Sequence, residues 1–303
     1  MNVYIIILNF NGYKDTIECI ESINRVYSTK YNIVVVDNSS TDDSVKELEN
    51  HLNGKITILH TDINRGYAGG NNIGIRYAID NGADYICILN NDTIVVEDFI
   101  LPCIHMLEQD CTIAFVGPTV LDYSNGKVQS TGGDISIFSG IVTRKNEGEE
   151  YFGLPTEIEC DYVGGACMVF GRGLIEAIGM IPECYFLFFE ETEWCYTAKQ
   201  KGYRNLCLGN IRILHKGSGS IGQINGLSEY MMNRNRVVFL KRNQANTLWT
   251  FIVYIGLCLK ALISTVKYGW KRLVYIRHYT DGWQEIVDYQ RYPFIYIGKR
   301  YED

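Results

Sequence analysis

The sequence lacks any Cys-x-x-Cys pair, although it holds ten cysteines among its 303 residues. Disulfide frameworks and zinc sites need cysteines at short, paired spacings, whereas these are scattered and several fall inside apolar runs. We therefore expect buried, reduced thiols in a cytosolic protein. The N-terminus also lacks the basic region and long apolar run of a signal peptide, because the chain turns polar at Asn9. Residues 3–8 are instead expected to form the first strand.

Acidic residues are absent from positions 241–280, in a chain whose net charge is −7. The same stretch carries the basic residues Lys241, Arg242, Lys260, Lys267, Lys271, Arg272 and Arg277. The negative net charge argues against nucleic acid as the main partner, so the basic segment is a local feature with a role of its own. There is also no internal repeat and no low-complexity linker. An apolar content of 47% suffices for one large α/β domain with an appendage or for two domains.

Short apolar runs alternate with helical patterns along the first part of the chain. Strands are predicted at 3–8, 33–36, 56–59 and 85–89, and helices at 15–26, around Val45 and Leu48, and at 71–79. This rhythm favours a parallel sheet with right-handed crossovers and helices on both faces. Farther along, we expect a helix at 97–108, strands at 113–116, 162–170 and 211–214, and loops or short antiparallel strands within 123–152.

Polar residues stand directly after several of the predicted strands. Asn9, Asp37 and Asp92 follow three of them, and ligands of such sheets bind at the carboxyl ends of the strands, so these residues should converge on one edge. The last of the three strands ends in Asn90, Asn91 and Asp92. A hard divalent cation takes oxygen ligands and often only one or two protein carboxylates, so Asp92 is the first candidate metal ligand. The alternative is a plain turn, which all three residue types favour.

Three later features allow both a functional and a structural interpretation. The glycine pair in YVGGACMVF, at 162–170, lets a ligand come close or marks a bulge. Glu190, Glu191 and Glu193 begin a predicted helix, where the helix dipole stabilises acidic residues whatever their function. His215 follows a predicted strand, where a histidine is either a ligand or a structural hydrogen-bonding group.

Seven motifs in order resemble glycosyltransferase family 2, the inverting nucleotide-sugar transferases of GT-A fold, and in particular its rhamnosyltransferase-like branch. They are NFNG at 9–12, VVVDNSS at 34–40, NRGYAGGNNIG at 64–74, LNND at 89–92, VGGACMVF at 163–170, FFEETEW at 188–194 and HKGSGS at 215–220, with YMMNRN at 230–235 after them. The resemblance implies an α/β fold with a Rossmann-like, mostly parallel sheet. It places a GT-A catalytic domain at 1–240, with a nucleotide-sugar-binding part at 1–122 and an acceptor-binding part at 123–240, and leaves a helical extension at 241–303.

The resemblance also implies a set of residues for the donor, which is expected to be a dTDP- or UDP-sugar. The set is Asn9, Asn11, Asp37, Asn64, Arg65, Gly66, Gly70, Asn71 and Asn91. Asp37 would bind the base by accepting a hydrogen bond from an imino N–H. The Gly-rich loop after the third strand would let its backbone approach the ribose and sugar. This loop lacks the G-x-G-x-x-G spacing of a dinucleotide site, which disfavours a dehydrogenase.

A metal site and a catalytic base follow from the same resemblance. Asp92 and His215, with Asn90 in place of the first carboxylate of the family's DxD motif, would hold Mn²⁺ or Mg²⁺, which neutralises the departing nucleoside diphosphate. Direct contact of Asn90 with the ion stays open, as does contact of His215 with the diphosphate instead. Glu191 would deprotonate the acceptor hydroxyl as it attacks the anomeric carbon, in a single displacement that inverts the configuration.

Acceptor-side residues come from the later motifs. The set implied is Gly164, Gly165, Glu190 and Trp194. Glu190 and Glu193 are also alternatives to Glu191 as the base. The acceptor expected is a saccharide or a glycan carried on a polyprenyl diphosphate, and its choice depends on the variable region 123–161 and on the C-terminal part.

Positions 248–266, LWTFIVYIGLCLKALISTV, are almost wholly apolar and are interrupted by Lys260. A membrane span needs about 20 apolar residues and tolerates an internal lysine poorly. The basic and aromatic flanks suit a helix that lies on a membrane surface, while packing on the catalytic domain or a partner subunit and a true span are the alternatives. We expect a cytoplasmic protein that contacts the inner face of the cell membrane, and a homo-oligomer stays open.

These observations together predict a metal-dependent inverting glycosyltransferase that acts in the synthesis of a surface polysaccharide or lipid-linked glycan. A nucleotide-sugar pyrophosphorylase is disfavoured, because no Gly-rich, basic turn follows the first strand. The alternative from another class is an inactive subunit that binds nucleotide sugar or glycan. Such a protein would have no reason to keep Asp92, Glu191 and His215 together.

Overall fold

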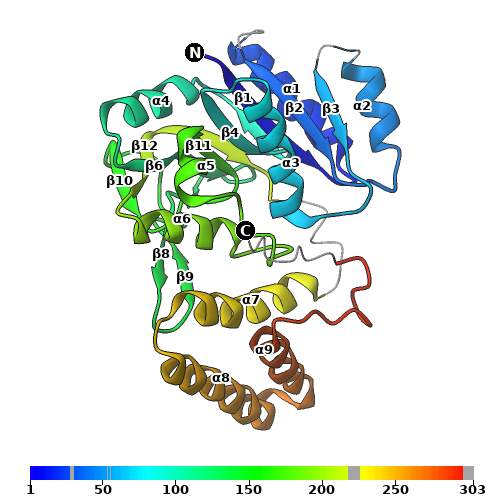
Figure 1. The fold of residues 1–303 in the computed structure, drawn as a ribbon, viewed down its shortest axis with the longest axis vertical. Coiled ribbons are helices and arrows are strands. Elements are labelled where there is room, and N and C mark those ends of the chain that lie inside the picture. The colour runs from blue at the N-terminus through cyan, green and yellow to red at the C-terminus, as the bar shows by residue number, and fades with distance from the viewer. Residues whose placement is uncertain (28–30, 53, 55, 218–225, 296–303) are drawn as a thin grey trace.

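The computed structural model describes residues 1–27, 31–52, 54, 56–217 and 226–295, and shows a sheet flanked by helices with a smaller helical group at one end (Figure 1). The strands are β1 (Val3–Asn9), β2 (Asn32–Asp37), β3 (Thr57–His60), β4 (Tyr85–Asn90), β5 (Thr93–Val95), β6 (Ile113–Asp122), β7 (Val128–Ser130), β8 (Gly133–Ser136), β9 (Ile141–Arg144), β10 (Glu157–Cys160), β11 (Cys167–Gly171) and β12 (Arg204–His215). The helices are α1 (Tyr13–Tyr27), α2 (Ser44–Leu52), α3 (Gly66–Asp80), α4 (Ile100–Gln109), α5 (Gly173–Ile178), α6 (Glu190–Gln200), α7 (Leu227–Asn243), α8 (Thr247–Tyr268), the 3-10 helix η2 (Trp270–Leu273) and α9 (Val274–Gln284).

The parallel half of the sheet consists of the four strands predicted in the first part of the chain. Strands β3, β2, β1 and β4 pair in parallel, and their bounds differ from the predicted ones by one residue at most. Ile5 and Ile7 face one core, which α1 and α4 cover, whereas Ile6 faces the other, which α3 and α6 cover. An α/β sheet covered on both faces is therefore confirmed.

The second half of the sheet places the end of β12 next to the end of β4. β11 pairs antiparallel with β4 and with β6, and β12 pairs in parallel with β6. The short β5, which follows β4 directly, pairs antiparallel with the end of β12, so that Thr93 lies opposite His215. β6 and β12 pair with each other from Ile113 and Arg204 to Asp122 and His215, so both are longer than the predicted strands 113–116 and 211–214.

Two predicted features around glycines are wrong. The expected Gly-rich loop is largely the first turns of α3, which begins at Gly66 rather than at Asn71. Its glycines let the helix lie close to β1: a Cβ at Gly74 would come within 2.5 Å of Ile6 Cγ2. The predicted strand 162–170 begins only at Cys167, so the glycine pair lies in the turn before β11.

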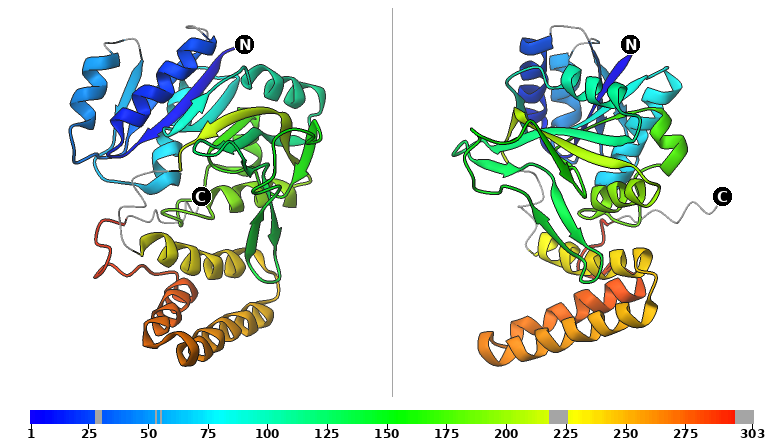
Figure 2. Two further views of the ribbon diagram at one scale, coloured as in Figure 1. Left: turned by 180° about the vertical axis from the view of Figure 1, so that it is seen from behind. Right: turned by 90° about the vertical axis from the view of Figure 1, so that its left-hand side faces the viewer.

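The C-terminal helices form a unit that is attached to the sheet domain through α7. Figures 1 and 2 show α7 between the sheet domain and the side-by-side pair α8 and α9. Val237 of α7 packs with Leu257 of α8 and Tyr279 of α9 in one apolar cluster. The hairpin of β8 and β9 also reaches this unit, where Trp249 Nε1 donates to Phe138 O at 2.8 Å. Helix α7 itself runs through position 240, the predicted end of the catalytic domain.

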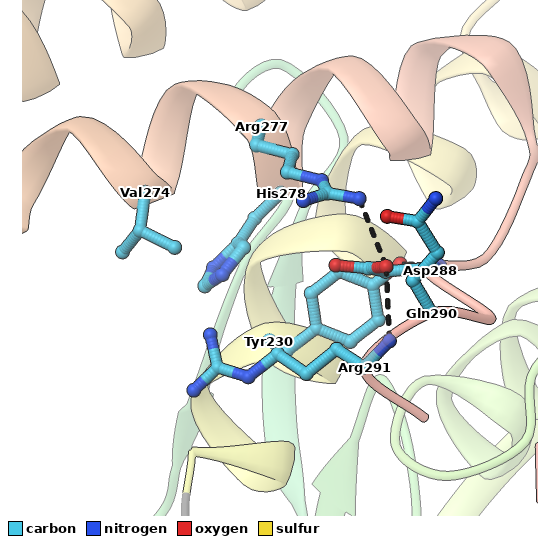
Figure 3. A pocket seen from close by; sticks show the side chains of 7 residues that line it. All are labelled: Tyr230, Val274, Arg277, His278, Asp288, Gln290 and Arg291. Atoms are coloured by element: carbon cyan, nitrogen blue, oxygen red, sulfur yellow. Dashed lines mark hydrogen bonds and ion pairs between the residues drawn. The ribbon is translucent and has the colours of Figure 1, made fainter. Parts of the chain in front are cut away.

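A cavity of about 240 Å³ lies between α7, α9 and the segment after α9 (Figure 3). Its charged groups bind one another: Arg277 Nη2 lies 2.8 Å from Asp288 Oδ1. Tyr230 of α7 accepts from the Asp288 backbone N–H at 2.8 Å and donates to Asp281 Oδ2 at 2.9 Å. These contacts fasten the segment after α9 to α7.

The outward side of α8 is apolar and exposed. Its exposed large apolar residues are Leu248, Trp249, Phe251, Ile252, Ile255, Leu259, Leu262, Ile263, Val266 and Tyr268, and Lys260 and Lys267 are exposed among them. Among the described residues, α8 is the one helix long and apolar enough to cross a membrane. Its opposite side packs on α7 and α9 through Leu257 and Ala261, so in this fold the helix lies along the protein.

Candidate active site

A cleft of about 1140 Å³ opens at the carboxyl ends of the parallel strands. It brings together ten of the predicted site residues, Asn64, Gly66, Asn90, Asn91, Asp92, Gly164, Gly165, Glu190, Glu191 and His215. Seven others do not line it, and these are Asn9, Asn11, Asp37, Arg65, Gly70, Asn71 and Trp194. Of the predicted HKGSGS motif, positions 218–220 lie outside the described residues.

Asp92 and His215 form a close pair at one end of this cleft. Asp92 Oδ1 lies 3.0 Å from His215 Nε2, and the Asn90 amide nitrogen lies 3.4 Å from the same ring nitrogen. Burial raises the pKa of Asp92, but the hydrogen bond and charge of His215 and the charge of Lys216 outweigh it, so that the pKa lies below its usual value. Asp92 is thus an ionised, largely buried carboxylate.

Gln129 on β7 orients the histidine. His215 Nδ1 lies 2.7 Å from Gln129 Oε1, which accepts and does not donate, so Nδ1 carries the proton. The 3.0 Å contact with Asp92 is then a hydrogen bond from Nε2–H, and Nε2 can offer its lone pair to a cation once that proton leaves. Gln129 is a site residue that the sequence interpretation missed, because it lies on a short strand in a region expected to be irregular.

The pair fits a divalent cation. Two ligand atoms 3.0 Å apart match neighbouring positions on an octahedral ion with bonds of about 2.1 Å, whose ligands lie about 3 Å apart. Among the described residues, no group of three or more His, Cys, Asp or Glu side chains could hold a metal. Asp92 and His215 would therefore hold an ion that takes its other ligands from Asn90, water or a substrate phosphate.

Glu190 and Glu191 lie at the start of α6, where they line the cleft. Burial raises the pKa of both carboxyl groups, and the charge of Glu191 raises that of Glu190 further, well above its usual value. The Oε2 atom of each has no hydrogen-bond partner among the described residues. A carboxylate with a raised pKa and a free oxygen in a cleft is suited to take up a proton.

Glu193, the third carboxylate of the cluster, has a structural role. It accepts from Tyr185 Oη at 2.5 Å and from Asn243 Nδ2 at 2.8 Å, and forms an ion pair with Arg242 at 2.7 Å. It does not line the cleft. The alternative of Glu193 as the base is therefore wrong, because its oxygens already bind three side chains.

Asp37 also differs from its predicted role as a ligand of the base. Its carboxylate accepts from Asn9 Nδ2 at 2.8 Å and from Ser40 Oγ and N at 2.6 and 3.1 Å, and the residue is 2% exposed. Asn11 likewise binds within this region, since its Oδ1 accepts from Thr41 N at 2.8 Å. These residues join the loops after β1 and β2 and do not reach the cleft.

Asn38, the residue after Asp37, takes the cleft position instead. Its Nδ2 donates to Asn64 Oδ1 at 3.0 Å, and both side chains line the cleft. The apolar run of β2 ends at Asp37, so the sequence pattern indicates that residue and not Asn38. Asn38 also donates to Gly66 O at 3.1 Å and accepts from Arg65 N at 2.9 Å, so its amide holds Asn64 and the start of α3 in place at the cleft.

The remaining predicted residues outside the cleft have structural contacts. Arg65 forms an ion pair with Asp62 at 2.7 Å, and Asn71 is buried with its amide donating to Tyr67 O at 2.9 Å. A Cβ at Gly70 would lie 2.3 Å from Leu8 Cδ1, so this glycine serves helix packing.

Trp194 is a core residue, which corrects its assignment to the acceptor site. Its ring lies 4.6 Å from that of Phe115 and 5.1 Å from that of Phe170, and Nε1 donates to Gly179 O at 2.9 Å. Because α6 turns this side chain away from the cleft-facing Glu190 and Glu191, it cannot contact an acceptor there.

Tyr67 connects the donor side to the acceptor side. It lies in the first turn of α3, lines the cleft, and donates to Gly165 O at 2.5 Å. Burial and the charges of Glu191 and Glu190 raise its pKa well above the usual value. Tyr67 therefore stays a neutral hydrogen-bond donor that fixes the glycine turn opposite the carboxylates.

The family model for Glycosyl transferase family 2 matches residues 4–178, more than half of the chain. The chain belongs to glycosyl transferase family 2. This confirms the predicted family, and the match covers Asn38, Asn90 and Asp92 at the ends of β2 and β4. It ends before the Glu190 cluster and His215.

Two curated relatives resemble this family member over longer stretches. The low-salt glycan biosynthesis hexosyltransferase Agl10 of Haloferax volcanii is 28% identical over 213 residues, which are 69% of this chain and 64% of the relative. The dTDP-rhamnosyl transferase RfbF of Shigella flexneri is 24% identical over 285 residues, 88% of this chain and 90% of the relative. The chain thus spans just under two thirds of Agl10 and nearly all of RfbF.

Solved glycosyltransferase structures share the fold. GalNAc-T7 with UDP, GalNAc and Mn²⁺ aligns with a TM-score of 0.61 at 17% identity, covering 79% of this chain and 48% of that one. The mannosyltransferase PcManGT of Pyrobaculum calidifontis, in complex with GDP-Man and Mn²⁺, aligns with a TM-score of 0.58 at 14% identity, covering 93% and 87%. The predicted GT-A fold is confirmed by these likenesses.

Proposed function

We propose that this family 2 member is a metal-dependent inverting glycosyltransferase, which moves a sugar from a nucleoside diphosphate to a saccharide or lipid-linked glycan in surface polysaccharide synthesis. One observation carries the proposal. The cation-binding pair Asp92 and His215 and the proton-accepting Glu191 line one cleft. An inactive binding subunit would not need a buried carboxylate with a raised pKa beside a metal pair.

Two groups of residues that line the cleft would share the reaction between them. Asp92 and His215, with Asn90 beside them, would hold the ion, which when bound would supply positive charge for the departing diphosphate. Glu191 takes the proton of the acceptor hydroxyl, since its raised pKa lies closer to neutral pH than that of an exposed glutamate. A single displacement by that hydroxyl inverts the anomeric carbon. Burial and the charge of Glu191 raise the pKa of Glu190 well above its usual value, so Glu190 can hold a proton beside Glu191 and donate to a sugar oxygen.

The donor proposed is a dTDP- or UDP-sugar bound with Mn²⁺ or Mg²⁺. The name of RfbF states a dTDP-rhamnosyl transfer, and the two solved neighbours hold Mn²⁺ with UDP or GDP-Man. The uncharged side chain of Asn64, which Asn38 holds at the cleft, suits the base and ribose, whereas Asp92 and His215 suit the diphosphate through the ion. The sugar itself follows from none of these contacts.

The protein is proposed to lie on the inner face of the cell membrane through α8. The exposed apolar side of this helix, the lysines and arginines after it and the lack of acidic residues from 241 to 280 support contact with anionic lipid. The acceptor end of the cleft includes Leu227, Met232 and Phe294 from the C-terminal part, which suits a glycan carried on a lipid. The alternative is that a second copy of the chain, and not a membrane, packs on the exposed apolar side of α8.

Donor binding across a panel of nucleotide sugars, with and without Mn²⁺ or Mg²⁺, tests the proposal. We expect one donor to bind only with metal, and Asp92→Ala to weaken that binding at least about 100-fold, because it removes a metal ligand. Asp80→Ala, at the exposed far end of α3, is the matched control and should bind normally. Metal-independent binding with no turnover would favour the inactive binding subunit instead.

A further inference from the structure

The segment that leads into α6 has an uncommon backbone. Phe188 and Phe189 both have positive φ angles, 66° and 76°, in the two positions immediately before Glu190. Bulky L-residues avoid this left-handed region, because Cβ crowds the carbonyl oxygen. Two in succession persist only where surrounding groups hold them. The turn decides where the side chains of Glu190 and Glu191 point.

Asn235 on α7 holds this turn. Its Nδ2 donates to the carbonyl oxygens of Leu187 and Phe188 at 2.7 and 2.8 Å, and the residue is fully buried. Both hydrogens of the amide are therefore used on the two peptides at the start of the strained pair. Because both partners are acceptors, they also fix which end of the amide faces the turn.

Arg234 of α7 and Tyr67 of α3 hold the same segment in place. Arg234 Nη1 donates to Asn235 Oδ1 at 2.5 Å, and its Nε donates to Ile286 O at 2.7 Å. Arg234 is 1% exposed, so this network lies away from solvent. From the other side, the backbone N–H of Tyr67 donates to Phe186 O at 2.9 Å. Consecutive carbonyls before α6 are thus held from α7 and from α3.

We propose that Asn235 is a positioning residue: by binding the carbonyls of Leu187 and Phe188, it fixes the turn that aims Glu191 into the cleft. This inference rests on the proposed role of Glu191 as the base. Asn235 does not line the cleft, so it acts on the reaction through Glu191 and not through contact with substrate. Its removal should leave the metal pair, and with it donor binding, in place.

The test compares Asn235→Leu with Asn205→Leu in the full chain. Asn205 is an equally buried asparagine whose Nδ2 also donates to two carbonyls, those of Asp161 and Cys195, but it lies on β12 and outside the cleft. It therefore controls for lost stability. For Asn235→Leu we expect kcat to fall about 100-fold from misplacement of the base, with metal-dependent donor binding retained. Asn205→Leu, at the same folded fraction, should keep kcat.

Two further measurements separate positioning from folding. Adding Asn235→Leu to Glu191→Gln should lower kcat little further, because both changes act through one carboxylate. The milder Asn235→Ser should move the acid limb of kcat/KM to lower pH, since a loosened Glu191 is better solvated and its pKa falls. The inference is overturned if both Asn235 variants keep kcat, or if they lose kcat and donor affinity together as a destabilised protein would. If Glu191→Gln keeps full activity, the proposed function fails, and this inference with it.

Discussion

At the scale of single residues, the site depends on the geometry of a few polar side chains. Asp92 and His215 come within 3.0 Å of each other, although they are far apart in sequence, because β5 and β12 pair beside the end of β4. Gln129 then decides which ring nitrogen faces the carboxylate. A bound ion would take the place of the proton between these two groups, and Gln129 would keep the ring turned so that Nε2 faces the ion, which is why this outer partner matters.

Replacing Gln129 tests this arrangement. Gln129→Leu removes the acceptor for His215 Nδ1–H, so we expect Mn²⁺ affinity in the presence of nucleoside diphosphate to fall about 10–100-fold, measured by titration calorimetry. Gln129→Glu keeps an acceptor oxygen and is the matched control, which should bind Mn²⁺ at least as well as the wild type. Equal affinities for the leucine variant and the wild type would show that the histidine needs no such partner.

The strand tips were predictable at this scale, and their hydrogen bonding was not. Asp92 could be found because a buried apolar run ends at it, and Glu191 because a carboxylate cluster opens a helix. Nothing in the order of residues reveals that Asp37 is already bound by Asn9 and Ser40. Such saturation depends on which loops meet in three dimensions, so Asn38 was overlooked beside it.

At the scale of elements, the sheet could be predicted and the glycine-rich segment could not. Continuous apolar runs specify buried parallel strands, and the strands from β1 to β4 follow them closely. Glycine disfavours helices by propensity, so the segment at 64–70 was expected to be a loop. The packing of α3 on β1 overrides that preference, because a Cβ at Gly70 would lie 2.3 Å from Leu8 Cδ1 and only a glycine lets this first part of the helix lie against the strand.

Helix α6 carries both core and cleft residues, which made the acceptor side harder to predict than the donor side. Trp194 and Glu193 belong to α6 together with Glu190 and Glu191, and the helix turns the first pair inward and the second pair toward the cleft. A cluster of acidic and aromatic residues indicates a site but not which members face it. The left-handed turn at Phe188 and Phe189 decides which of these side chains face the cleft. It contains no glycine, so the sequence gives no signal for it.

At the scale of the whole molecule, the C-terminal unit is part of the same body as the catalytic cleft. Arg242 of α7 pairs with Glu193 of α6, and Trp249 of α8 binds the β8–β9 hairpin. Because α8 packs on α7 and α9 along one side, a span would have to give up those contacts. A helix lying flat with its outer side in lipid keeps them, and agrees with the mixture of exposed apolar residues and nearby cations.

Vesicle binding tests this orientation. Leu259, Ile263 and Val266 are 52%, 70% and 92% exposed on the outer side of α8, and burying one such side chain in an apolar phase is worth about 1.5–3 kcal/mol. Replacing all three by glutamine should lower partition into anionic vesicles at least about 10-fold, with fold and cleft unchanged. Phe152→Gln, at an equally exposed position on the sheet domain, is the control. Unchanged vesicle binding together with a smaller oligomer would identify a second copy of the chain as the partner of α8.

The measurement that tests the central claim most directly is single-turnover transfer by Glu191→Gln beside its donor binding. The change removes a proton acceptor while keeping the size of the side chain. We therefore expect donor and metal to bind as in the wild type and the single-turnover rate constant to fall about 10²–10⁴-fold. Glu176→Gln, on the exposed side of α5, should match the wild type in both. Full turnover by Glu191→Gln would contradict the account, because no base would then be needed at the start of α6.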